Sequence, residues 1–405
     1  ERQRGLQASF DYSWNLLPPD LQTHLARLAV FRGGFDAAAA AEICGVGAQS
    51  LARLADACLL STSEGRWDIH ALNRQFVSAR LAAIGEEAGE TAVKHARYYA
   101  DLLAAQRYEI GSSRHLLAVA RIQTEIENIR AAWQALVERK MDVELLNCAD
   151  ALARFYDSSA WFGEALEVFG RAAEAVNTPE FSMARAAVLN RLGLFAYRVG
   201  DLSCAEQALK ESGDLLAASS SGEEKAFHHA LFAHFWLRKG EMEKAWEQSE
   251  ISLALYDTLG QSLGMADVRC CRADLVYRAG RVEDAQRITL EALKLAEQSG
   301  DGRALVTVLN QLGDIRAHLG DDAGSLDTFR RSLEISRQLG DLFKVAIQLN
   351  NVGTVLYTTG NINGAEAAYR ESLGICEQIG DRPGQAIALS NLAEALVAQA
   401  QYAEG

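Results

Sequence analysis

Three histidines lie close together in the chain, and histidine is the residue type most often used to bind a metal ion. His228 and His229 are adjacent, and His234 follows five positions after His229. Two ligands on one helix face need a spacing of three or four residues. We therefore expect no metal site here.

Motifs that carry enzyme chemistry do not occur in the sequence. The pair Gly33-Gly34 lacks the lysine of a phosphate-binding Gly-x-x-x-x-Gly-Lys-Ser/Thr loop, and no such loop occurs elsewhere. There is no Gly-x-Ser-x-Gly elbow and no His-Glu-x-x-His pair. The seven cysteines form no Cys-x-x-Cys pair, which is typical of small buried residues in a reducing compartment. We expect a chain that binds and does not catalyse.

Glycines mark a strict period along most of the chain. One series has a spacing of forty residues and a second repeats it half a period later: Gly200, Gly240, Gly280, Gly320 and Gly360, then Gly260, Gly300, Gly340 and Gly380. Glycine adopts positive φ without strain and therefore often ends a helix. The apolar segments between the glycines predict two helices per period, stacked into a solenoid with a long surface for a partner.

Small residues recur in two columns of this period. The columns are Gly193, Ala233, Ala273, Gly313, Gly353 and Ala393, and, twelve positions later, Ala205, Ala245, Ala285, Ser325 and Ala365. They predict close contact between the two helices of each pair. The same pattern extends back to about Leu145, where we expect the array to begin.

This pattern resembles the tetratricopeptide repeat, with a period of forty residues where the family usually has about thirty-four. The resemblance implies that one face of each first helix lines a concave groove. It places these side chains there: Asn190, Tyr197, Arg198, His234, Arg238, Asp274, Tyr277, Arg278, Asn310, Asp314, Asn350, Asn351, Tyr357, Asn391 and Glu394. Asparagine can donate to and accept from a peptide backbone, and tyrosine offers a flat amphipathic surface.

Two interpretations of these polar rows stay open. In the first, the rows bind a ligand, and the opposite charges in neighbouring rows select a charged one. In the second, the same side chains lie on solvated helix faces and bind nothing.

The first 85 residues follow a different pattern. Helices are predicted over 6–16, 18–31, 36–43 and 49–58, followed by a hairpin over 59–69 around Ser63-Glu64-Gly65. Helices followed by a hairpin describe a winged helix, a fold that often binds DNA. This segment has eight Lys/Arg and eight Asp/Glu, so it has no basic excess for phosphate contacts.

Several segments together resemble the winged-helix domain of bacterial STAND-class signalling ATPases, which are NB-ARC relatives with tetratricopeptide-like sensors. The segments are Ser9-Phe10-Asp11-Tyr12-Ser13-Trp14, Leu17-Pro18-Pro19-Asp20, Leu28-Ala29-Val30-Phe31-Arg32-Gly33-Gly34-Phe35 and Ile69-His70-Ala71-Leu72-Asn73-Arg74-Gln75-Phe76. The segment Glu125-Ile126-Glu127-Asn128-Ile129-Arg130-Ala131-Ala132 resembles the helical connector that follows the winged helix in that family.

The resemblance implies a nucleotide switch. In that family the winged helix holds an upstream nucleotide-binding domain closed around ADP, and the histidine of a Met-His-Asp-like motif contacts the β-phosphate. Ile69, His70 and Ala71 occupy the three positions of the motif. Because Ala71 stands where the motif has an acidic residue, the resemblance assigns a role to His70 alone. Alternatively, His70 caps the helix that begins at Ala71. ADP or ATP with Mg²⁺ is expected in the full-length protein and no cofactor in this chain.

Composition limits the other classes of function. A net charge of −14 argues against general nucleic-acid binding, and no stretch of about 18 apolar residues predicts a membrane helix. Without a signal peptide, the cytoplasm is the expected location. The chain begins at Glu1 without methionine and ends within a repeat at Gly405, so we expect it to be part of a longer protein.

We therefore expect an all-α chain with three parts: a winged-helix domain over 1–85, a helical connector over 86–144 and a right-handed tetratricopeptide-like α-solenoid over 145–405. The expected function is that of the regulatory and sensor arm of a STAND ATPase. The winged helix would autoinhibit the upstream domain, and the solenoid would bind a peptide or protein inducer. Activation would involve oligomerisation. The alternatives are a peptide-docking scaffold without a nucleotide switch and a transcription regulator that binds DNA through the winged helix.

Overall fold

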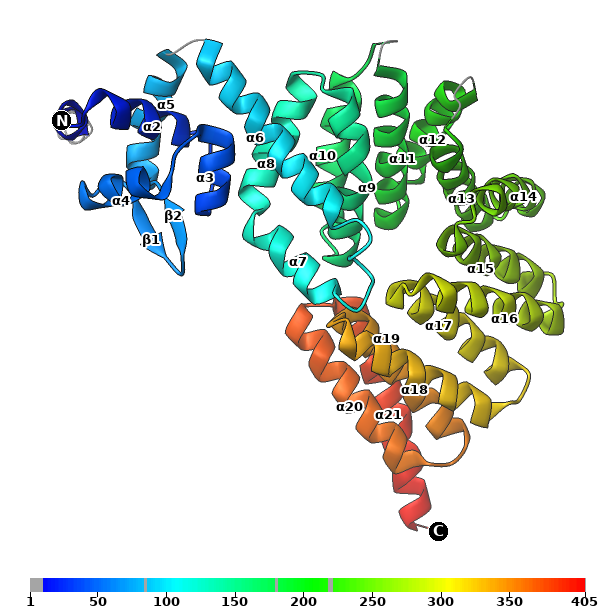
Figure 1. Ribbon diagram of the computed structural model, residues 1–405. Helices are drawn as coiled ribbons and strands as arrows, with labels where there is room; N and C mark the ends of the chain where they lie inside the picture. The colour runs from blue at the N-terminus through cyan, green and yellow to red at the C-terminus, as the bar shows by residue number, and fades with distance from the viewer. Residues whose placement is uncertain (1–9, 84–85, 179–180, 218–220, 405) are drawn as a thin grey trace. The chain divides into compact units, whose positions relative to one another are not determined.

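The computed structural model describes residues 10–83, 86–178, 181–217 and 221–404, and these are almost entirely helical (Figure 1). The chain divides into two compact units. We call Glu1–Arg107, Leu117–Ser159 and Glu167–Val188 the N-terminal unit, and Tyr108–Leu116, Ala160–Leu166 and Leu189–Gly405 the repeat unit. The predicted all-α class with a small β-hairpin is confirmed. The domain boundaries predicted at 85 and 144 stay predictions.

The N-terminal unit begins with a helix-and-hairpin arrangement. Residues 10–15 are helical, and the elements that follow are α2 (Pro19–Leu28), α3 (Ala37–Cys44), α4 (Ala48–Asp56), β1 (Ser61–Ser63), β2 (Arg66–Asp68) and α5 (Ala71–Ala83). The strands are antiparallel, with Ser61 opposite Asp68. Glu64 and Gly65 between them have φ of 52° and 78°, the positive pair of a type I′ turn. This is the order of elements expected of a winged helix.

Aromatic rings join α6 to these first elements. The helices that follow α5 are α6 (Glu86–Ala105), α7 (His115–Thr124), α8 (Ile126–Glu138), α9 (Asp142–Ser158) and α10 (Phe162–Ala175). Phe31 and Phe35 stack at 4.2 Å between ring centroids, and His95 and Tyr99 of α6 lie against Phe31 at 5.6 and 6.5 Å. Burial lowers the pKa of His95 to about 4, so its ring packs as a neutral group.

Helix pairs build the repeat unit, and α11 begins in the N-terminal unit. The first helices are α11 (Ser182–Val199), α13 (Gly222–Lys239), α15 (Ser262–Arg278), α17 (Gly302–His318), α19 (Leu342–Thr358) and α21 (Arg382–Glu404), and the second helices are α12 (Leu202–Ala217), α14 (Met242–Leu259), α16 (Val282–Ser299), α18 (Asp322–Gln338) and α20 (Ile362–Ile379). From α13 to α20, each first helix packs against the second helix that follows it. Consecutive first helices from α13 to α21 also contact one another.

The periodic glycines end these helices as predicted. All nine have φ between 64° and 88°, a region that L side chains rarely adopt. The residue after the glycine often donates its backbone N–H five positions back, as Asn361 does to the Leu356 carbonyl at 2.8 Å. That bond is typical of a Schellman cap.

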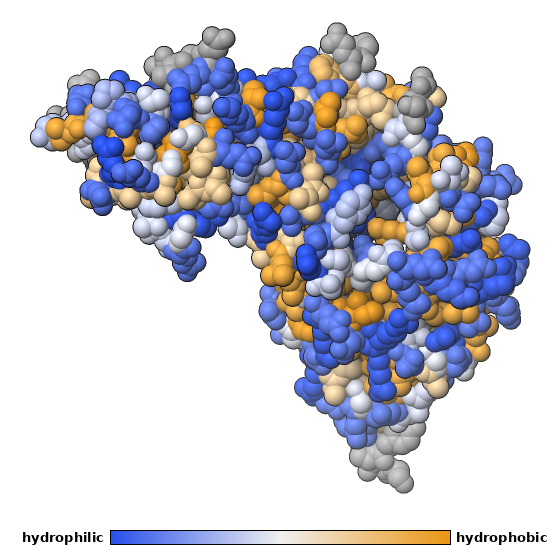
Figure 2. Space-filling model, in the orientation of Figure 1, coloured by the Kyte–Doolittle hydropathy of each residue, from blue (hydrophilic) through white to orange (hydrophobic). Residues whose placement is uncertain are grey.

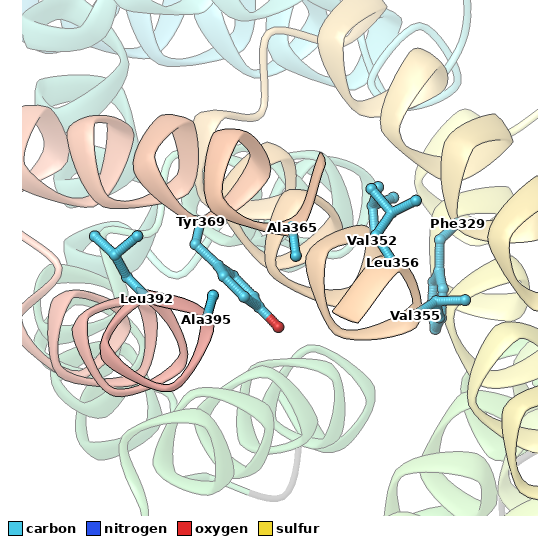
Figure 3. Close-up of a cluster of buried hydrophobic side chains, with 8 residues drawn as sticks. All are labelled: Phe329, Val352, Val355, Leu356, Ala365, Tyr369, Leu392 and Ala395. Carbon is cyan, nitrogen blue, oxygen red and sulfur yellow. The ribbon is translucent and has the colours of Figure 1, made fainter. Parts of the chain in front are cut away.

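Small residues allow the two helices of a pair to touch, also as predicted. A Cβ atom added at Gly193, Gly313 or Gly353 would lie 2.9, 2.5 or 2.6 Å from the side chain of Leu209, Phe329 or Tyr369 of the second helix. The second column, Ala205, Ala245, Ala285, Ser325 and Ala365, is fully buried. Figure 3 shows the apolar cluster around Phe329 and Tyr369.

A column of serines that was not predicted also recurs in the second helices. The hydroxyls of Ser252, Ser332 and Ser372 donate to backbone carbonyls 26 residues earlier, at 2.8, 3.4 and 2.8 Å. Each serine therefore bonds the second helix of a pair to the first.

Hydrophilic residues cover much of the face that Figure 2 shows, with apolar residues between them. Among the helices that the structure describes, none is both long enough and apolar enough to cross a membrane.

Replacing Gly313 with alanine should lower the melting temperature, because the new methyl group would lie 2.5 Å from the buried Phe329 ring. Overpacking of this kind costs about 1–3 kcal/mol. Gly374→Ala is the matched control, since no atom lies within 4 Å of a Cβ there, and it should stabilise α20 by about 0.5–1 kcal/mol. Thermal unfolding followed by circular dichroism measures both. A Gly313→Ala melting temperature at or above that of the wild type would contradict the tight contact.

Candidate functional site

Polar side chains connect neighbouring first helices of the repeat unit at a step of 41 residues. Asn351 of α19 donates its Nδ2 to Oδ1 of Asn310 on α17 at 2.9 Å. Asn391 of α21 donates in the same way to Asn350 of α19, also at 2.9 Å. We call these four residues the asparagine ladder. Their side chains are half-buried, so the ladder stabilises the helix stack and is also part of its surface.

The aromatic and arginine rows make contacts with the same step. Arg238 of α13 donates to the backbone carbonyl of Tyr197 at 2.7 Å, and its guanidinium lies 4.9 Å from the centre of the Tyr197 ring. The Tyr277 hydroxyl and His318 Nδ1 are 3.2 Å apart. Side chains of the predicted rows therefore already contact neighbouring helices of the stack.

A pocket of about 520 Å³ opens between α15 and α17. Its lining consists of Asp274, Tyr277, Gln311, Asp314, Ile315, Ala317 and His318. We call it the α15–α17 pocket. Its volume lies within the usual range of about 300–1,000 Å³ for ligand sites.

The pocket brings together three residues predicted for the groove, Asp274, Tyr277 and Asp314. The sequence analysis missed Gln311 and His318. Both could have been found from the period, because Gln311 continues the column of Asn351 and Asn391, and His318 continues that of Arg278. Gln311 donates to the Cys270 carbonyl at 2.9 Å, which fixes its side chain.

The two carboxylates of the pocket differ in their partners. Asp274 forms an ion pair with Arg278 at 3.2 Å. Asp314 accepts from the neutral amide of Asn310 at 3.3 Å, and among the described residues no cation lies within ion-pair distance of it. The Asp314 carboxylate remains accessible, but the protein around it excludes enough water to raise its pKa to about 6.

One predicted groove residue is not on the surface. Asn190 is fully buried, and its Nδ2 donates to Glu224 at 2.6 Å while His228 lies 2.9 Å from its Oδ1. The buried carboxylate of Glu224 also pairs with Arg191, and a buried ion pair needs such additional hydrogen bonds. The expectation that Asn190 lines the groove is therefore wrong. Burial lowers the pKa of His228 to about 3, so that ring is neutral.

The remaining predicted positions are accessible to different degrees. Half-buried are Tyr197, His234, Asp274, Tyr277, Asn310, Asn350, Asn351, Tyr357 and Asn391, and exposed are Arg198, Arg238, Arg278, Asp314 and Glu394. His234 Nε2 lies 3.2 Å from the Asp267 carboxylate of the next first helix. Tyr357 packs against the cluster around Tyr369.

In the N-terminal unit, His70 lies directly before α5 and is exposed. Its backbone carbonyl accepts the first helical hydrogen bond from the Arg74 N–H at 2.9 Å. The Arg74 side chain pairs with Asp68 of β2 and donates to the Arg32 carbonyl at 3.0 Å. These bonds fix the start of α5 against the hairpin.

The connector motif holds the Gly33-Gly34 turn and the hairpin. Asn128 accepts from the Arg32 N–H at 2.9 Å and donates to the Gly34 carbonyl at 3.1 Å. Glu125 pairs with Arg66 of β2 at 2.5 Å. Both connector side chains are buried, with exposed fractions of 1% and 7% for Asn128 and Glu125. The sequence predicts a helical connector here, but these contacts were not predicted.

Residues 264–338 and 345–404 match the family model of the tetratricopeptide repeat. This part of the chain is a tetratricopeptide repeat array. The array and the residues before it share their fold with a solved signal transduction ATPase with numerous domains (STAND) that carries a tetratricopeptide repeat sensor, from Pyrococcus horikoshii. The TM-score is 0.53 at 16% identity, over 96% of this chain and 62% of that one. The predicted resemblance is thus confirmed at the level of the fold.

Curated relatives match a shorter part of the chain. Putative HTH-type transcriptional regulators of Mycobacterium bovis and Mycobacterium tuberculosis are 31% identical over 185 residues, which is 41% of this chain and 21% of each regulator. This chain therefore spans about one fifth of the length of these relatives.

Replacing Asn128 with alanine should remove the side-chain acceptor of the Arg32 N–H and one of the two donors to the Gly34 carbonyl, which also accepts from Arg66. The loss of such bonds costs about 1–3 kcal/mol, so we expect lower stability and faster amide exchange over residues 32–35. Asn363→Ala, which removes an exposed amide bonded to Gln399, is the control and should leave exchange at 32–35 unchanged. Hydrogen exchange by mass spectrometry measures both variants. Equal amide exchange at residues 32–35 in the Asn128 variant and the wild type would show that Asn128 does not hold this turn.

Proposed function

We propose that this chain is the regulatory and sensor arm of a STAND-class signal transduction ATPase, and that its tetratricopeptide array binds a peptide or protein inducer. The α15–α17 pocket is the observation that carries the proposal. Asn310 joins the pocket to the asparagine ladder, because it bonds both Asp314 and Asn351. Four successive first helices therefore offer polar groups along a single path.

The chemistry of this path favours a peptide over a small apolar ligand. Asparagine side chains offer both donors and acceptors, which is what a peptide backbone requires. The existing bonds between neighbouring helices hold these groups in place, so little side-chain freedom is lost when a ligand binds. The pocket adds room for one side chain of that ligand.

An inducer activates such a protein only by binding one arrangement of the arm better than the other. In our proposal, the winged helix restrains an upstream nucleotide-binding domain in its ADP state, and the inducer favours the ATP-bound oligomer. The exposed position of His70 at the start of α5 fits a contact with a phosphate group, because helix N-termini favour anions. A neutral imidazole donates one hydrogen bond, and protonation would add charge assistance.

His70→Ala in the full-length protein should speed the release of ADP and raise basal signalling. His70→Asn is the control for the capping alternative, since asparagine is a good N-cap but lacks the imidazole. Stopped-flow release of a fluorescent ADP measures both. If His70 only caps α5, His70→Ala lowers the melting temperature and His70→Asn restores it. Neither variant then changes the rate of ADP release, and that result would exclude a contact between His70 and the phosphate.

A scaffold without a nucleotide switch remains the first alternative. If the array only docks partners, adding a peptide that binds it would leave the rate of ADP exchange in the full-length protein unchanged. A change in the exchange rate would favour the switch.

A DNA-binding regulator is the second alternative, and the names of the curated relatives favour it. Against it, α4 carries one arginine, Arg53, which lies 3.6 Å from Asp20, and one aspartate, Asp56, so the helix before the hairpin has no excess of positive charge. Tight, sequence-selective binding of DNA by this chain in a gel shift at low salt would favour this alternative.

A further inference from the structure

The α15–α17 pocket has a charge pattern that indicates which ligand group it binds. We propose that it binds the cationic side chain, lysine or arginine, of a peptide inducer, with Asp314 as the charge partner. This inference rests on the proposed function, because it assumes that the array binds a peptide. It adds that the peptide must carry a basic residue.

Asp314 is the residue that gives the pocket this preference. Its carboxylate accepts a hydrogen bond from the neutral amide of Asn310 at 3.3 Å, whereas Asp274 of the same pocket already pairs with Arg278. A carboxylate that has lost part of its hydration without gaining a cation is unfavourable when it is ionised. An incoming ammonium or guanidinium group would supply the missing partner and make a charge-assisted hydrogen bond.

The other walls suit the rest of such a side chain. The ring of Tyr277 is half-buried, and its hydroxyl is positioned by His318, so the ring can take a cation against its face. Ala317 is exposed and provides apolar surface for the methylene groups of lysine or arginine, whereas Ile315 of the lining is buried. An acidic residue of a ligand would instead meet two carboxylates.

The pH dependence of binding follows from the charges around Asp314. The titratable groups of the lining are Asp274 and Tyr277 on α15 and His318 on α17, with Arg278 paired to Asp274. From α19, the groups that reach Asn310 are the neutral amides of Gln348 and Asn351. Asp314 carries no charge below its pKa of about 6, so affinity for a cationic peptide should rise as the pH increases through 6.

An array of blocked nonapeptides tests the inference, with each position occupied in turn by lysine, arginine, glutamine or glutamate. The purified 405-residue chain should bind lysine or arginine peptides more tightly than the matched glutamine peptides, on the order of tenfold at pH 7.5. Asp314→Asn should remove that preference and reduce the rise in affinity through pH 6. Tyr277→Phe keeps the ring and should keep the preference.

Asp327→Asn is the matched control, because it removes the same charge from an exposed position on α18. It should bind like the wild type. Asp314→Asn should melt no lower than the wild type at pH 7.5, since it replaces a partly desolvated charge by a neutral isostere.

Peptides that bind without a cationic preference, or a preference that survives in Asp314→Asn, would overturn this inference and leave the proposed function intact. Failure of every peptide to bind would overturn this inference together with the proposal that the array binds a peptide.

Discussion

The repeat unit depends on the close approach that small residues permit between the two helices of a pair. Gly313 faces the Phe329 ring and Gly353 the Tyr369 ring at distances that leave no room for a Cβ atom. A glycine in the middle of a helix costs about 0.5–1 kcal/mol, so its recurrence at this place indicates that the helix contact outweighs the cost. The serine hydroxyls that bond across the pair, such as Ser372 to the Ala346 carbonyl, tighten the same contact.

Because the pairs are equivalent, consecutive first helices meet with the same register each time. That register produces the step of 41 residues seen in the asparagine ladder and in the contact of Tyr277 with His318. The polar rows therefore have two roles. They stabilise the stack, and they hold the walls of the α15–α17 pocket in place.

The N-terminal unit uses a different device, a buried polar clamp. Asn128 satisfies one donor and one acceptor of the turn between α2 and α3, and Glu125 holds Arg66 of the hairpin. Buried polar groups are costly unless every partner is present, so such a clamp favours one arrangement of turn, hairpin and connector. It joins the turn and the hairpin to the beginning of α8.

The sequence by itself determined where the helices of the array end and which residues lie between them. Glycine φ preferences and apolar periodicity act over a few residues, so Gly200 to Gly380 could be interpreted directly. Tertiary structure decided which members of a column remain open. Asn190 and Asn310 share a column, yet the former is fully buried and bonds Glu224, while the latter is half-buried and bonds Asp314 of the pocket. The partners of Asn128 also lie more than 90 residues away, and no local pattern specifies such a contact.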